Sequence, residues 1–291
     1  MSQINILGED LERVVNVAQI PQLSPFRYPG GKTWLVPRVR HWLMSLPEPP
    51  AIFVEPFAGG GIVSLTVAAE RFAEHVLMVE LDDQVAAVWK TIMGRNWKWL
   101  ADRITSFDLT YEHLKEALSK SPKSVREKAF QTVLKNRTYH GGILADGSGV
   151  LKHGENGRGI HSRWYPDTIR KRIFLIQEFK SRIEFVEGDG LTVMEQHIDE
   201  PGTVFFIDPP YTAGGKRAGK RLYRYNELDH ARLFDLAKRA KGDCLLTYDD
   251  APEVRSLAEK YGFDTRLIAM QNTHLAKMKE LLIGKSLDWL N

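Results

Sequence analysis

The chain has 291 residues, of which 43% are hydrophobic and 26% charged, an ordinary globular composition that argues against a disordered or collagen-like chain. Its formal charge is only +3, from 40 Lys and Arg against 37 Asp and Glu, so net charge does not identify a nucleic-acid-binding protein. The single cysteine, Cys244, excludes a disulfide framework and multi-cysteine metal sites. With no long apolar segment and no basic leader, we expect a cytoplasmic protein without a membrane partner.

The first predicted elements form a strand–helix–strand unit. Residues 52–55 are a short apolar run that stops at Pro56, and three glycines, Gly59 to Gly61, precede residues with helical spacing. A second apolar run, residues 76–79, ends at Glu80. Two strands joined by a helix predict a parallel sheet.

The strand–helix alternation then stops. Residues 95–138 have helical periodicity throughout, and residues 139–166 are rich in glycine, histidine and arginine, which is typical of a hairpin or a mobile loop. We therefore predict a mainly helical insert over residues 94–182.

The α/β pattern resumes after this insert. Strands are predicted at 183–186, 203–207, 244–247, 266–269 and 280–283, with a helix near 228–240. The predicted fold class is α/β, with a sheet of about seven strands and helices on both faces. Residues 25–93 and 183–291 would form the main domain, and residues 1–24 an N-terminal extension.

The glycine turn after the first strand indicates a nucleotide-containing ligand. Gly59 and Gly61 allow the backbone to approach a ligand closely, and Glu80, at the end of the next strand, can accept hydrogen bonds from both ribose hydroxyls. NAD, a flavin and S-adenosylmethionine all remain open at this point. The structural alternative is a simple turn beside a solvated glutamate.

Asp208-Pro209-Pro210-Tyr211 follows a strongly apolar strand. Two prolines cannot continue a strand ladder, so they would hold the Asp208 carboxylate and the Pro209 carbonyl rigidly at the edge of the sheet. Tyr211 would present an aromatic ring beside these two acceptors. This arrangement suits a planar base that stacks on the ring and donates hydrogen bonds from an exocyclic amine.

Taken in order, six segments resemble the N6-adenine DNA methyltransferases, and among them the Dam-like group. The segments are Tyr28-Pro29-Gly30-Gly31-Lys32-Thr33, Phe53 to Gly61, Glu80, Glu187-Gly188-Asp189-Gly190, Asp208 to Tyr211, and Lys279-Glu280-Leu281-Leu282-Ile283. The resemblance covers roughly residues 24–285 apart from the insert. It implies a Rossmann-like methyltransferase sheet with a target-recognition insert. It also implies a site-specific enzyme that moves a methyl group from S-adenosylmethionine to N6 of a flipped adenine in double-stranded DNA, without a metal.

The resemblance also implies roles for individual residues. Tyr28 and Lys32 would lie near the methionine end of S-adenosylmethionine. Glu80 would bind the ribose, and Asp189 the amino group of the cofactor's adenine. The remaining residues expected to line the cofactor are Glu55, Phe57, Gly59 and Gly61. Asp208, Pro209, Pro210 and Tyr211 would hold the target base, with Asp208 acting first as a hydrogen-bond acceptor because an ordinary aspartate is a weak base.

Basic residues gather in two places that could contact DNA. In the insert, the candidates for reading base edges or binding phosphate are Arg137, Arg158 and His161. After the Asp-Pro-Pro-Tyr motif, a glycine-flanked basic segment is predicted to bind phosphates through Lys216, Arg217, Lys220 and Arg221. A solvated surface is the structural alternative for both. If the protein belongs to a restriction–modification system, its partner would be a restriction endonuclease that acts separately.

Other features of the sequence could suggest different functions. Gly31-Lys32-Thr33 resembles the end of a phosphate-binding loop, but Phe26 occupies the position of the required first glycine. The nine histidines lack metal-ligand spacing, and Cys244 is expected to be a buried, unreactive residue within a strand. The remaining rivals are methylation of RNA adenine or cytosine N4, a catalytically inactive DNA-binding homologue, and an NAD oxidoreductase.

Overall fold

The structure, a computed structural model, describes residues 14–28, 30–145, 147–154, 157–211, 227–271 and 277–290. Within these residues the chain forms one seven-stranded sheet. Its strands are β1 (Ile52–Glu55), β2 (His75–Glu80), β3 (Ile183–Glu187), β4 (Thr203–Ile207), β5 (Cys244–Asp249), β6 (Asp264–Gln271) and β7 (Lys277–Gly284). The expected number of strands and their positions are confirmed.

The strand order is β3-β2-β1-β4-β5-β7-β6. The first five strands along this order are parallel, with Val54 of β1 paired to Leu77 of β2 on one side and to Phe205 of β4 on the other. β7 is antiparallel to both of its neighbours, which the expectation of a parallel sheet did not include. The link from β6 to β7 is too short for a crossover, so the two strands can only pair as a hairpin.

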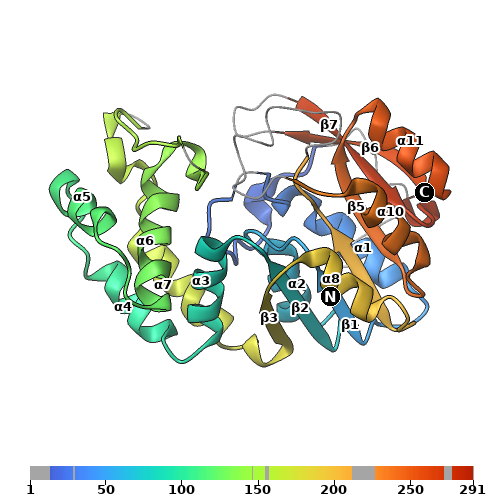
Figure 1. Cartoon of the computed structure of the whole chain (residues 1–291), viewed down its shortest axis with the longest axis horizontal. Coiled ribbons are helices and arrows are strands. Elements are labelled where there is room, and N and C mark those ends of the chain that lie inside the picture. The colour runs from blue at the N-terminus through green and yellow to red at the C-terminus, as the bar shows by residue number, and fades with distance from the viewer. Residues whose placement is uncertain are drawn as a thin grey trace.

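Helices cover both faces of the sheet, as predicted. The helices α1 (Val36–Ser45), α2 (Ile62–Glu70) and α3 (Asp83–Met93) lie on one face, and α8 (Gly190–His197), α10 (His230–Arg239) and α11 (Pro252–Tyr261) on the other (Figure 1). Successive residues of a strand point to opposite faces. Accordingly, Phe53 and Phe206 pack in the core beneath the first three helices, while Val54 and Phe205 pack beneath the other three.

Between α3 and β3 the chain forms a helical layer. It consists of α4 (Trp97–Thr105), α5 (Tyr111–Ser119), α6 (Val125–Thr138) and α7 (Pro166–Ile176). Thr110 and Ser124 cap the amino ends of α5 and α6 by accepting backbone N–H groups. Figure 1 shows these helices beyond α3, on the side away from β6 and β7. Their apolar residues continue the core that α3 forms with the sheet, so the division at residue 94 stays a prediction.

The glycine-rich block contains less regular structure than a hairpin. An antiparallel bridge joins Tyr139 to Val150; the short 3-10 helix η3 (His140–Gly142) lies between these two residues, and η5 (Gly159–Arg163) follows them. The other 3-10 helices of the described chain are η1 (Val17–Gln19), η2 (Thr33–Leu35), η6 (Lys180–Arg182) and η8 (Asp288–Leu290). Over the described residues, every helix is too short or too polar to cross a lipid bilayer.

Candidate active site

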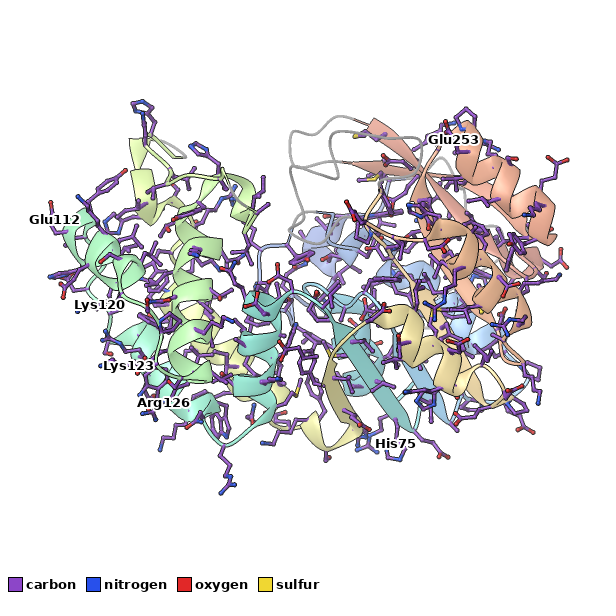
Figure 2. All side chains as sticks on the ribbon, viewed as in Figure 1. His75, Glu112, Lys120, Lys123, Arg126 and Glu253 are labelled. Atoms are coloured by element: carbon purple, nitrogen blue, oxygen red, sulfur yellow. The ribbon has the colours of Figure 1, made fainter. Side chains whose placement is uncertain are left out.

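A hollow lies where the parallel strands end. Because β1, β2 and β4 run in the same direction, the residues after their last positions meet at one edge of the sheet. A cavity of about 1120 Å³, part of it open to solvent, occupies this edge. His75, at the start of β2, marks the opposite edge (Figure 2).

The glycine turn between β1 and α2 forms one wall of the cavity. Gly59 and Gly61 have φ angles of 48° and 62°, a backbone conformation that favours glycine. A Cβ atom at Gly59 would lie 2.5 Å from Cε1 of Tyr28, and one at Gly61 would lie 2.5 Å from Cε of Met78. The close packing around this turn therefore excludes side chains at both positions.

Two buried carboxylates stand beside the turn. Glu80 accepts backbone hydrogen bonds from Gly59 at 2.9 Å and from Asp82 at 2.8 Å, and burial raises its pKa to about 7. Glu55 accepts the backbone N–H of Ser64 at 3.0 Å and also the Ser64 hydroxyl, while burial raises its pKa to about 8. A ligand with hydroxyl or ammonium groups would lower both pKa values, because it would favour the ionised carboxylates.

All eight residues that the sequence assigned to cofactor binding line this one cavity. They are Tyr28, Lys32, Glu55, Phe57, Gly59, Gly61, Glu80 and Asp189. Asp189 also caps the amino end of α8 by accepting the backbone N–H of Leu191 at 3.0 Å. The insert contributes Gly142, Leu144 and Ala145 to the wall, which the sequence gave no reason to expect.

Asp208 stands at the tip of β4, and its two carboxylate oxygens have different surroundings. Oδ1 accepts hydrogen bonds from the hydroxyls of Tyr211 and Thr247, both at 2.8 Å, and lies 2.9 Å from Nζ of Lys32. Within the described chain, Oδ2 makes no hydrogen bond, and Asp208 lines the cavity together with Pro210. One oxygen is thus held by the protein, while the other can accept a ligand's hydrogen bond.

Tyr211 does not belong to the described lining of the cavity. Its ring packs on Tyr248 with a centroid distance of 5.6 Å and an interplanar angle of 24°. Burial, with Asp208 and Glu280 nearby, raises the pKa of its phenol well above the ordinary value. The neighbouring Pro209 is buried and is likewise absent from the described lining. The stacking role expected of Tyr211 stays a prediction.

Lys32 contacts the Asp-Pro-Pro-Tyr motif. Its Nζ lies 2.9 Å from Oδ1 of Asp208, 3.1 Å from Oε1 of Glu280 and 2.9 Å from the carbonyl oxygen of Gly30. Neither Glu280 nor Thr247, which hydrogen-bonds Asp208, was assigned a role from the sequence. The available signal for Thr247 was a polar residue that follows two apolar ones in β5, and for Glu280 its place in the last of the six segments that resemble the family.

The predicted DNA-contacting residues divide into three groups. Arg137 is only 6% exposed and donates a hydrogen bond to the carbonyl of Pro25; burial lowers its pKa to about 10. Arg137 therefore lies in the interior, where its guanidinium braces the N-terminal segment against α6, and its assignment as a base reader stays a prediction. Arg158 and His161 are exposed on the insert. The predicted phosphate-binding residues Lys216, Arg217, Lys220 and Arg221 lie outside the described residues.

Cys244 is buried, as predicted, although it is the first residue of β5 and not a central one. Its Sγ lies 3.4 Å from the carbonyl oxygen of Ala237. Burial raises the pKa of the thiol to about 12, so the reactive thiolate is scarce at neutral pH.

The sheet order and the cavity at its carboxyl edge define a Rossmann-like methyltransferase fold. Residues 28–271 match the family described as D12 class N6 adenine-specific DNA methyltransferase. The chain therefore belongs to this family, as the Dam-like resemblance predicted, and the family implies S-adenosylmethionine as the methyl donor and DNA as the substrate.

Solved structures and curated proteins were also compared. An rRNA methyltransferase from Streptomyces viridochromogenes is 11% identical, with a TM-score of 0.42 and coverage of 94% of each chain. A precorrin-6y C5,15-methyltransferase from Geobacter metallireducens is 10% identical, with a TM-score of 0.37 and coverage of 97% of each chain. At these scores the likenesses have no bearing on substrate. The search of curated proteins found no match.

Proposed function

We propose that this protein transfers a methyl group from S-adenosylmethionine to N6 of an adenine that has been turned out of double-stranded DNA. The observation that carries the proposal is a cavity whose wall contains the glycine turn, Glu80 and Asp208, and in the described part of the chain Oδ2 of Asp208 makes no hydrogen bond. A cofactor and a target base could therefore meet within it.

The residues of the cavity fit the methyl donor. Each carboxylate oxygen of Glu80 has two lone pairs and accepts one hydrogen bond from a described backbone N–H. Each oxygen can therefore accept a further hydrogen bond, for example from a ribose hydroxyl. Glu55 can pair with a ligand's ammonium group, which would offset the burial of its charge. S-adenosylmethionine, when bound, supplies an electrophilic methyl group.

The contribution of the catalytic motif is to orient the amine. The lone pair of an adenine amine is delocalised into the ring, so the amine is a poor nucleophile. Acceptors at Oδ2 of Asp208 and at the Pro209 carbonyl would favour a more tetrahedral nitrogen with its lone pair available. Asp208 is also a carboxylate that can accept the one proton that the methylated nitrogen releases.

Reaching the amine requires the base to leave the helix. Unstacking the adenine costs about a few kcal/mol, and stacking of the adenine on Tyr211 would offset part of this cost. The exposed insert residues Arg158 and His161, together with the basic segment that contains Lys216 and Arg221, are the proposed DNA contacts. Neutralising both Lys216 and Arg221 should weaken DNA binding and flatten its salt dependence.

The decisive experiment incubates the protein with labelled S-adenosylmethionine and DNA that lacks modified bases, then digests the DNA to nucleosides. We expect label in N6-methyladenine. Label in N4-methylcytosine, or in RNA alone, would overturn the proposal. DNA binding without cofactor binding or turnover would identify an inactive homologue.

A further inference from the structure

Glu280 reaches the catalytic edge because β7 runs against the other strands. β4 and β5 end at this edge, whereas an antiparallel strand begins there, so a residue early in β7 lies beside them. The register pairs Glu280 with Asp249, the last residue of β5. Glu280 is only 5% exposed and precedes the apolar residues 281–283. A buried carboxylate at this position needs partners.

Its partners are the side chains that also bind Asp208. Oε1 of Glu280 lies 3.1 Å from Nζ of Lys32 and within hydrogen-bond distance of the Tyr211 hydroxyl, whose single proton can be donated to Glu280 or to Asp208. Lys32 and Tyr211 in turn contact Oδ1 of Asp208, at 2.9 Å and 2.8 Å. Two bridges, one ammonium and one phenol, therefore connect Glu280 to the same oxygen of Asp208.

We propose that Glu280 is a positioning residue for the methyl transfer: it holds Lys32 and Tyr211 so that Oδ1 of Asp208 stays engaged and Oδ2 stays open to the cavity. This inference rests on the proposed function. Glu280 is not among the described residues that line the cavity. It acts by fixing the rotation of the Asp208 carboxylate, because a carboxylate with one oxygen tied to Lys32, Tyr211 and Thr247 cannot turn freely.

Glu280 and Asp208 are two carboxylates that lie beside the same ammonium group, that of Lys32. Burial raises the pKa of Glu280, the negative charge of Asp208 adds to this, and Lys32 opposes it. Two carboxylates therefore share one ammonium and one phenol. Without Glu280, Lys32 could turn entirely toward Asp208 and compete with the amine for its open oxygen.

The test separates this role from a structural one through two substitutions at the same position. Glu280→Ala removes both bridges, and we expect the single-turnover methylation rate to fall by about 10- to 100-fold, the range for a misplaced catalytic group. Glu280→Gln can keep an acceptor at the Oε1 position, which makes both contacts, and should recover most of the rate. The affinities for S-adenosylmethionine and DNA should stay near those of the unchanged protein.

A matched control is Glu253→Ala, which removes an exposed glutamate at the first turn of α11 (Figure 2) and should leave the rate unchanged. Should Glu280→Ala destabilise the fold, Tyr211→Phe and Glu280→Met, singly and combined, supply a double-mutant cycle, because methionine keeps the length of the side chain without an oxygen acceptor. Positioning through the phenol predicts that the two rate losses are not additive.

A wild-type rate in Glu280→Ala would overturn the inference. Equal losses in the alanine and glutamine variants, or a rate loss that merely follows lost cofactor affinity, would overturn it as well. An unchanged protein that methylates no adenine would instead overturn the proposed function itself, so the two failures are distinguishable.

Discussion

Replacing Asp208 with asparagine tests whether its two oxygens have different roles, with Oδ1 bound by the protein and Oδ2 accepting a hydrogen bond from the target amine. The amide has nearly the same size but a single oxygen. If that oxygen takes the place of Oδ1, it keeps the contacts with Tyr211, Thr247 and Lys32, and the NH2 group faces the cavity. An NH2 group donates hydrogen bonds and would meet the donor N–H of the target amine. If the amide adopts the flipped orientation, its NH2 group faces those three donors instead.

The structure sets the expected size of each loss. In the first orientation Lys32 keeps its contact with Glu280, so we expect the free energy of unfolding to fall by about 1–3 kcal/mol, as for a weakened hydrogen bond to a charged group. The reaction loses one positioned acceptor, which corresponds to a decrease of about 10²- to 10³-fold in rate. Cofactor affinity should change little, because Asp208 makes none of the contacts described for Glu80 or Gly59.

The assay is a single-turnover reaction with excess enzyme, labelled S-adenosylmethionine and DNA free of N6-methyladenine, quantified as nucleosides. Titration calorimetry measures cofactor binding in parallel. Asp250→Asn, at an exposed aspartate paired with Arg255, is the matched control and should react normally. Normal turnover in Asp208→Asn would refute the reasoning. Loss of cofactor binding together with turnover would show instead that the end of β4 had collapsed.

Three further predictions concern other parts of the site. Burial raises the pKa of Glu80 from 4.5 to about 7, so between these pH values the folded protein holds a proton that the unfolded chain releases. Without cofactor, the free energy of unfolding should therefore decrease as the pH rises from 4.5 to about 7. Glu80→Gln should make this decrease smaller in thermal-unfolding curves. Gly61→Ala, at a φ of 62°, should lower the free energy of unfolding by about 1–3 kcal/mol in urea titrations, whereas Gly188→Ala, whose new Cβ would meet ordinary contacts, should not. Arg158→Gln should weaken DNA binding and reduce its salt slope by about one unit. Arg137→Gln should lower stability and leave that slope unchanged; the reverse pattern would identify Arg137 as a DNA contact.

The sequence by itself located the seven strands, and for β1 and β4 also the residues where they begin and end. Apolar runs, glycine turns and the two prolines are local signals, because strand formation and turn geometry depend on neighbouring residues. These signals located β1, β4 and the glycine turn that lines the cavity. Parallel strands end at one edge, so Glu80 and Asp208 could be expected there together. The same reasoning could not find that β7 runs the other way, since strand direction depends on pairing across the sheet.

Tertiary structure alone decided which distant side chains meet. Lys32 was assigned to the cofactor, yet it also binds Asp208 and Glu280, which lie far along the chain on other elements. Arg137 looked like a surface cation in the sequence, whereas the packing of the N-terminal segment on α6 buries it. Such contacts follow from sheet order and helix packing, which no local pattern encodes, so burial and ion pairing of charged residues are set only when the chain folds.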